Sequence, residues 1–84
     1  MGTEAATPIH RGQPLRGAGG RRIGTVDAVF ADYLLVRTTG LLPVDLYVPR
    51  SEVNLDERGA PSVNLSAREA YAAWHRPLKQ APHD

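Results

Sequence analysis

The sequence predicts a mainly β fold: a small barrel or strongly curved sheet of five to six short antiparallel strands, with one short C-terminal helix. Short apolar runs are separated by turns that contain Gly, Pro or Asp. The one clear helix signal comes late in the chain. The 84 residues leave room for a single core, and a sheet that closes on itself exposes no edge.

The folded unit is expected to cover residues 14–75, between flexible tails at residues 1–13 and 76–84. The first segment has no hydrophobic period, so it cannot bury enough apolar surface to offset its ordering entropy. Pro77 and Pro82 interrupt the last segment. The chain has no cysteine, which excludes disulfides and thiolate sites. Hydrophobic burial must therefore stabilise the domain.

A first hairpin is expected between Pro14–Arg16 and Arg22–Phe30, because the glycines of Gly17–Gly20 permit the positive φ of a tight turn. Apolar residues of the second strand recur every three positions, at Ile23, Val26 and Val29. A flat strand cannot place all three on one face, so a β-bulge is predicted near Gly24 or Asp27. A helix would also explain the spacing, but Gly, Thr and Val are poor helix formers.

The next strands are expected at Tyr33–Thr38 and Asp45–Pro49, the first paired with the strand before it. Their inward positions alternate with outward ones and are Leu34, Val36, Leu46 and Val48. Pro49 lacks an N–H and suits a strand end or a sheet edge. A second hairpin is expected between Glu52–Asp56 and Pro61–Leu65.

A short helix is predicted from Ala67 to about Trp74. It begins with an S-x-x-E capping box, in which the side chains of Ser66 and Glu69 each satisfy a backbone donor. One face of the helix carries Ala70, Tyr71 and Trp74. A helix this short is marginal alone, so both aromatic rings are expected to pack over an open end of the sheet.

Three segments are similar to a known family. Arg22–Val29 resembles a hairpin strand of the pattern basic, Ile, Gly, x, Val, x, x, Val, and Asp32–Arg37 resembles the strand that follows it. Leu46–Val53 is the most specific match, since related sequences have a similar Leu-Tyr-Val-Pro segment before a turn. Across residues 14–74 the pattern resembles the PRC-barrel fold, and more narrowly a bacterial PRC-barrel-like family of unknown function.

The resemblance implies a fold and leaves the activity open, because the matching residues serve packing and turns. Proteins with this fold include a domain of the photosynthetic reaction-centre H subunit and the C-terminal domain of a ribosome-maturation factor, which both contact other proteins. The resemblance therefore implies a binding role by analogy. Neither a membrane anchor nor a companion domain like theirs is expected in this chain.

No catalytic, metal or phosphate site emerges from the sequence, so a non-enzymatic protein without a cofactor or small-molecule substrate is predicted. His10 and His83 lie in the expected tails, and His75 has no ligand three or four residues on. Most acids fall at turns or strand ends, and a small barrel leaves no cleft to perturb them. No G-K-[ST] motif follows Gly17–Gly20.

The segment Leu41, Leu42, Pro43 and Val44 is the leading candidate for a protein interface, because it is apolar where a connecting loop is normally polar. Two interpretations are open. The loop either folds over one end of the barrel and completes the core, or stays exposed and binds a partner. The leading hypothesis is a module that binds a protein or itself, the latter as a homodimer or other homo-oligomer.

The alternative hypothesis is weak binding of single-stranded nucleic acid by an arginine and aromatic surface. Its residues would be Arg21, Arg22, Arg37, Tyr47 and Arg50. A packed tyrosine and solvated arginines explain the same residues, and the net charge is only +1, so nucleic acid is not the expected partner. No apolar run approaches the roughly 20 residues of a membrane span, and a cytoplasmic protein without a membrane partner is expected.

Overall fold

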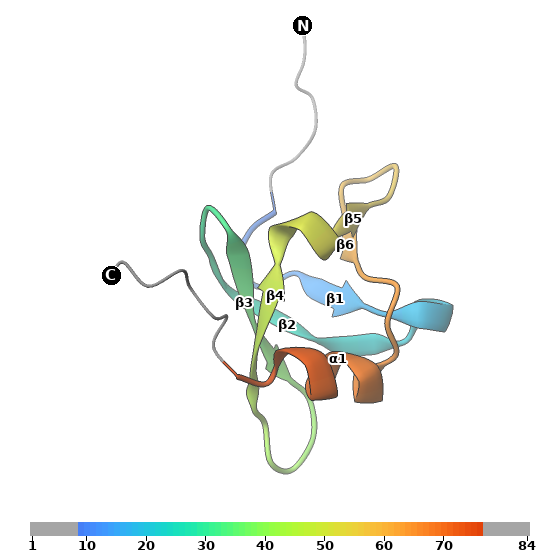
Figure 1. Cartoon of the computed structure of the whole chain (residues 1–84). Helices are drawn as coiled ribbons and strands as arrows, with labels where there is room; N and C mark the ends of the chain where they lie inside the picture. The colour runs from blue at the N-terminus through green and yellow to red at the C-terminus, as the bar shows by residue number, and fades with distance from the viewer. Residues whose placement is uncertain (1–8, 77–84) are drawn as a thin grey trace, which may run out of the picture.

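A computed structural model describes residues 9–76, which form one mixed sheet and one α-helix. The strands are β1 (Pro14–Arg16), β2 (Arg22–Val29), β3 (Tyr33–Thr38), β4 (Asp45–Pro49), β5 (Asn54–Leu55) and β6 (Pro61–Ser62), and the helix is α1 (Ala67–Trp74). Single 3-10 turns, at Ala18–Gly20 and Arg50–Glu52, follow β1 and β4. The strand order across the sheet is β4-β3-β2-β1-β6-β5 (Figure 1).

The sheet is open, so the expected closed barrel is not confirmed. Its edges are β4 and β5, and no ladder joins them within residues 9–76. After β4 the 3-10 turn leads directly into β5, which pairs over two residues with β6 and not with β4. The expectation of purely antiparallel strands is also wrong, because β1 and β6 run parallel through Arg16 and Ser62. The mainly β class and the short C-terminal helix are confirmed.

Two bulges bend β2, where the spacing of its apolar residues predicts one near Gly24 or Asp27. The register shifts at Asp27 against β3, and at Ile23, beside Gly24, against β1. Each bulge adds a residue that has no partner on the neighbouring strand and changes the face of those that follow. Consequently Ile23 and Val26 are both buried, whereas Val29 at the strand end is partly exposed.

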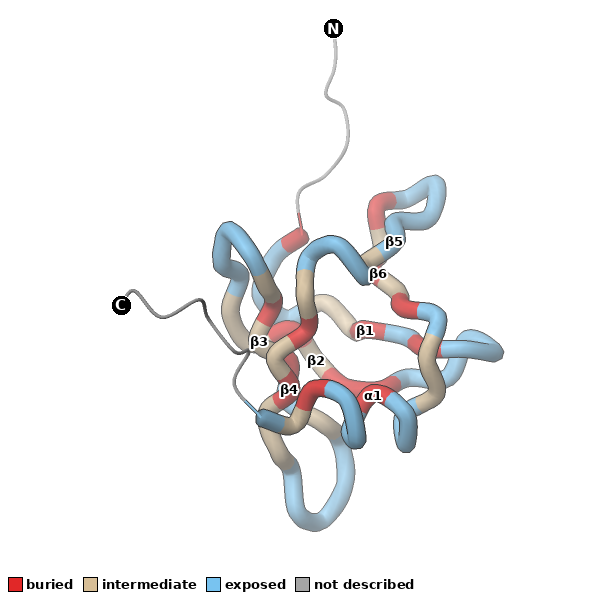
Figure 2. Tube along the Cα trace, in the orientation of Figure 1, coloured by how far each residue is buried: buried red, intermediate tan, exposed pale blue. Residues whose placement is uncertain are grey.

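The core lies between one face of the sheet and α1, which contacts β4 and β2. Figure 2 shows buried segments where these strands pass behind the helix. The buried apolar residues are Ile9, Leu15, Ile23, Val26, Leu34, Val36, Leu46, Val48, Val63, Ala70 and Trp74. All four predicted inward positions of β3 and β4 belong to this set.

Only one of the two aromatic rings of α1 is buried against the core. Trp74 is 8% exposed, whereas Tyr71 is 46% exposed, so the expectation that both are buried is wrong. Ala70 and Trp74 are four residues apart and share a face, but Tyr71 is rotated by about 100° from Ala70. Its ring stacks instead on the ring of His75, with centroids 4.5 Å apart.

The predicted capping box begins α1. The Ser66 Oγ accepts the backbone N–H of Glu69 at 3.1 Å, and the Glu69 Oε1 accepts the backbone N–H of Ser66 at 2.9 Å. At the other end, the backbone N–H of His75 donates to the Tyr71 carbonyl at 3.1 Å. The helix therefore has its expected limits.

The folded unit begins before Pro14. Ile9 is 9% exposed and belongs to the core, and the Gly12 N–H and the Gln13 carbonyl each bond to Val26 at 2.8 Å. These bonds continue the pairing of β1 with β2, so the expected tail is wrong for residues 9–13. The rest of the expected tails, residues 1–8 and 77–84, lies outside the described residues.

The turn between β5 and β6 is organised by Asp56. Its Oδ1 accepts the backbone N–H of Arg58 at 2.8 Å and that of Ala60 at 2.9 Å. Hydrogen bonds from Ala60 and then Arg58 favour the carboxylate and hold the pKa of Asp56 below its ordinary value. This turn therefore carries a negative charge at neutral pH.

Candidate protein interface

The loop between β3 and β4 separates into a buried base and an exposed tip. Leu41 is 99% exposed and Leu42 is 87% exposed, and Pro43 is exposed too. Val44 is half-buried and packs against the core. The interpretation that the loop completes the core therefore holds for Val44 alone. Figure 2 shows the loop between β3 and β4 as an exposed segment.

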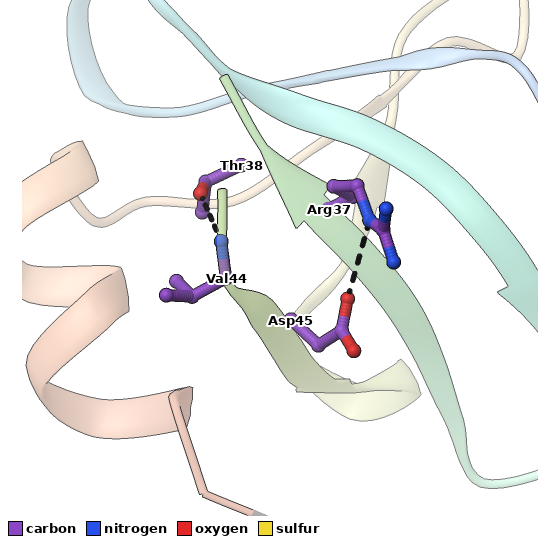
Figure 3. Close-up of polar contacts among 4 residues, drawn as sticks. All are labelled: Arg37, Thr38, Val44 and Asp45. Carbon is purple, nitrogen blue, oxygen red and sulfur yellow. Dashed lines mark hydrogen bonds and ion pairs between the residues drawn. The ribbon is translucent and has the colours of Figure 1, made fainter. Parts of the chain in front are cut away.

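The base of the loop is tied to β3 by a reciprocal pair of bonds. The Thr38 N–H donates to the Val44 carbonyl at 2.9 Å. The Val44 N–H donates in return to the Thr38 Oγ1, also at 2.9 Å (Figure 3). Gly40 has a φ of 121°, a conformation that favours glycine. The tip is therefore carried on a closed base and extends past α1, opposite the β2–β3 and β5–β6 turns (Figure 1).

An ion pair lies beside the same base. The Arg37 Nε is 3.5 Å from the Asp45 Oδ1 (Figure 3), and the Arg37 side chain is 59% exposed whereas that of Asp45 is 38% exposed. That oxygen is buried and accepts no hydrogen bond from residues 9–76, so the guanidinium charge is its compensation. Exposed pairs contribute about 0–1 kcal/mol. The pair therefore orients side chains at the base and adds little stability.

An apolar groove runs between the loop and α1. Its volume is about 470 Å³, and it is lined by Ile23, Thr38, Thr39, Leu42, Val44, Ala67, Arg68 and Tyr71. A second hollow of about 510 Å³ lies on the other side of the loop, where Arg37 and Asp45 make the lining more polar. Leu42 forms part of the first groove while remaining accessible. The exposed face of Tyr71 belongs to the same surface.

The predicted arginine surface is brought together in part. Arg37 points outward from β3, and its cross-strand neighbour Thr25 accepts a hydrogen bond from the Arg22 Nη2 at 2.7 Å. Tyr47 lies on the same outer face of β4. Arg50 is at the far end, where it donates to the Phe30 carbonyl at 3.1 Å.

The fifth predicted residue of that surface, Arg21, is exposed in the turn between β1 and β2. Its carbonyl accepts the Gly17 N–H at 2.8 Å, so it does not join the outer face of β3 and β4. Each of the other four residues contacts a neighbour in the domain. The three arginines contact Thr25, Asp45 and Phe30, and the ring of Tyr47 lies beside that of Tyr33. These contacts favour the interpretation in which the arginines are solvated surface residues.

Sequence reasoning missed an aromatic row on this outer face. The ring of Tyr33 stacks on that of Phe30, with centroids 4.7 Å apart, and lies 5.7 Å from the ring of Tyr47. The outward alternation of β3 could have placed Tyr33 there, but the pairing with Tyr47 depends on the register of β3 against β4. The three rings pack on one another, which explains why Tyr47 is only half exposed.

The comparisons with known proteins assign no family to this chain. No family model matches it, and a search of curated proteins gave no match. Two structural findings concern metal ligands and membrane-spanning helices. No three metal-ligating side chains gather anywhere in residues 9–76, and none of the helices in that range is long and apolar enough to cross a membrane.

Proposed function

We propose that this protein is a non-enzymatic binding module that holds a protein partner through the tip of the β3–β4 loop. The observation that carries the proposal is the exposure of Leu41 and Leu42, 99% and 87%, in a domain that buries Leu15, Leu34 and Leu46 completely. Burying a leucine side chain is worth about 1.5–3 kcal/mol. A partner that covers both residues gains that free energy.

The closed base of the loop supports the same proposal. Because the Thr38 and Val44 bonds hold both ends of the loop, few backbone conformations are lost when a partner binds. Reduced ordering cost raises affinity without further contacts. The groove beside Leu42 adds a concave apolar surface, which a flat polar surface would lack.

The proposal includes a place in the PRC-barrel-like family and a cytoplasmic location. Its support is the predicted Leu46–Val53 segment, which here forms an edge strand and a 3-10 turn, and the helix that ends at Trp74. A fold does not specify a partner. The identity of the partner therefore follows from the surface and not from the family.

Capture from native lysate tests the proposal. The baits are the wild-type chain, a Leu41→Asp, Leu42→Asp variant, and a Leu55→Asp control on exposed β5, with light scattering of each bait to detect self-association. A protein or a second copy should be held by the wild type and the control, and lost from the double variant. Retention by all three baits, or a monomer with no bound protein throughout, contradicts the proposal.

A further inference from the structure

Charged residues divide the folded domain into a basic and an acidic end. The loop end comprises the start of β2, the end of β3, the start of β4 and α1, because Gly24 pairs with Thr38 and α1 borders the groove. Its charged residues are six arginines against two carboxylates, a net charge of +4, because Arg16 of β1 pairs with Arg22: Arg16, Arg21, Arg22, Arg37, Arg68, Arg76, Asp45 and Glu69.

The opposite end carries the opposite sign. It comprises the β2–β3 turn, the 3-10 turn that bonds to it through Arg50 and Asp32, and the β5–β6 turn (Figure 1). Its charged residues are five carboxylates against three arginines, a net charge of −2, because Arg11 precedes the Gly12 N–H that bonds to Val26: Asp27, Asp32, Glu52, Asp56, Glu57, Arg11, Arg50 and Arg58. The exposed leucines therefore lie at the basic end.

This distribution decides between the candidate occupants of the loop and groove. A symmetric dimer would bring two basic ends together, and juxtaposed like charges oppose association. An anionic membrane would take the projecting tip but leave the concave groove unfilled. A protein segment that is both apolar and acidic would cover the exposed leucines, fill the groove and complement the charge of the basic end.

We propose that the partner presents a segment with a bulky apolar side chain flanked by carboxylates. The apolar side chain enters the groove between Leu42 and Tyr71, and a carboxylate pairs with Arg68 at its rim. The groove volume of about 470 Å³ falls in the range of about 300–1,000 Å³ that is typical of ligand sites. This inference rests on the proposed function and names the chemistry of its partner.

Nuclear magnetic resonance titration with a synthetic peptide of mixed leucine and glutamate tests the inference. Backbone amide shifts should concentrate at the loop, at Arg68 and at Tyr71. Binding should weaken about tenfold in Arg68→Glu and stay unchanged in Arg58→Glu, a matched reversal at the acidic end. An acidic residue in the first turn of α1 complements the helix dipole, so the Arg68→Glu variant should remain folded.

Two control peptides and one lipid probe complete the experiment. Replacing glutamate by lysine, or leucine by serine, should abolish the shifts, and vesicles of phosphatidylglycerol should not bind. Equal binding of the lysine peptide, shifts confined to other faces, no binding of the acidic peptide, or preferential binding of the vesicles overturns the inference. A partner captured through Leu41 and Leu42 that fails to compete with the acidic peptide leaves the proposed function standing and refutes this inference alone.

Discussion

Replacing Trp74 with alanine is expected to lower the melting temperature by at least about 12 °C. Removing a buried tryptophan side chain costs about 3–5 kcal/mol, and each kcal/mol shifts the melting temperature of so small a domain by about 4–8 °C. Trp74 is the one large ring that covers the core from α1. A domain of this size is stable by only about 5 kcal/mol, so the variant should be near unfolding at 25 °C.

Circular dichroism during heating measures the effect, with Tyr71→Ala as the matched control. Tyr71 lies on the same helix but is 46% exposed, with its ring stacked on that of His75, so its loss should cost under about 1 kcal/mol. Equal losses in the two variants would mean that both rings cover the core, contrary to the structure.

Replacing Gly24 with alanine is expected to destabilise the domain by about 1–3 kcal/mol. Gly24 does not have a positive φ, so the reason is steric. A Cβ there would meet the backbone carbonyl of Arg37 on β3, and one methyl group of Val36, closer than real Cβ atoms approach such groups. A side chain can move aside, but a strand that is hydrogen-bonded on both sides cannot. Urea unfolding of the variant measures the loss.

A double-mutant cycle identifies which contact is responsible. If the Arg37 carbonyl is the obstacle, the effects of Gly24→Ala and Val36→Ala should add within about 0.5 kcal/mol. If the Val36 methyl group is the obstacle, the double variant should lose less than the sum of the two single variants. The second result would contradict the close approach of β2 to the β3 backbone.

Features that depend on near neighbours in the sequence could be predicted. The capping box at Ser66 requires only a glutamate three residues later, and the bulge at Asp27 follows from a spacing of three in an otherwise β-rich run. The inward positions of β3 and β4 follow from strict alternation. In each case the local signal and the tertiary packing agree.

Features that depend on distant parts of the chain were missed. The sheet stays open because β5 pairs with β6 and not with β4, and no local signal specifies which distant strands pair. Ile9 is a lone apolar residue in a polar segment, so it has no period that would place it in a core. Tyr71 has helical spacing compatible with burial, but the width of the available core is set by the sheet.

The sequence indicated which loop is the candidate site, but not whether its leucines are buried or exposed. Four residues around Pro43 are unusual in any connecting loop, which is why the segment was found. Whether the leucines turn inward depends on the bonds between Thr38 and Val44, which close the loop before Leu41 and Leu42 can reach the core. The groove and the basic end required the position of α1 against β2 and β4.

The free energy of unfolding of the Leu41→Asp, Leu42→Asp variant tests most directly whether these leucines contribute to the stability of the fold. Because both side chains are nearly fully exposed, the free energy in urea should stay within about 0.5 kcal/mol of the wild-type value. A loss of about 2 kcal/mol or more would show that the leucines are buried in the isolated domain. The loop would then complete the core, and its role as an interface would be contradicted.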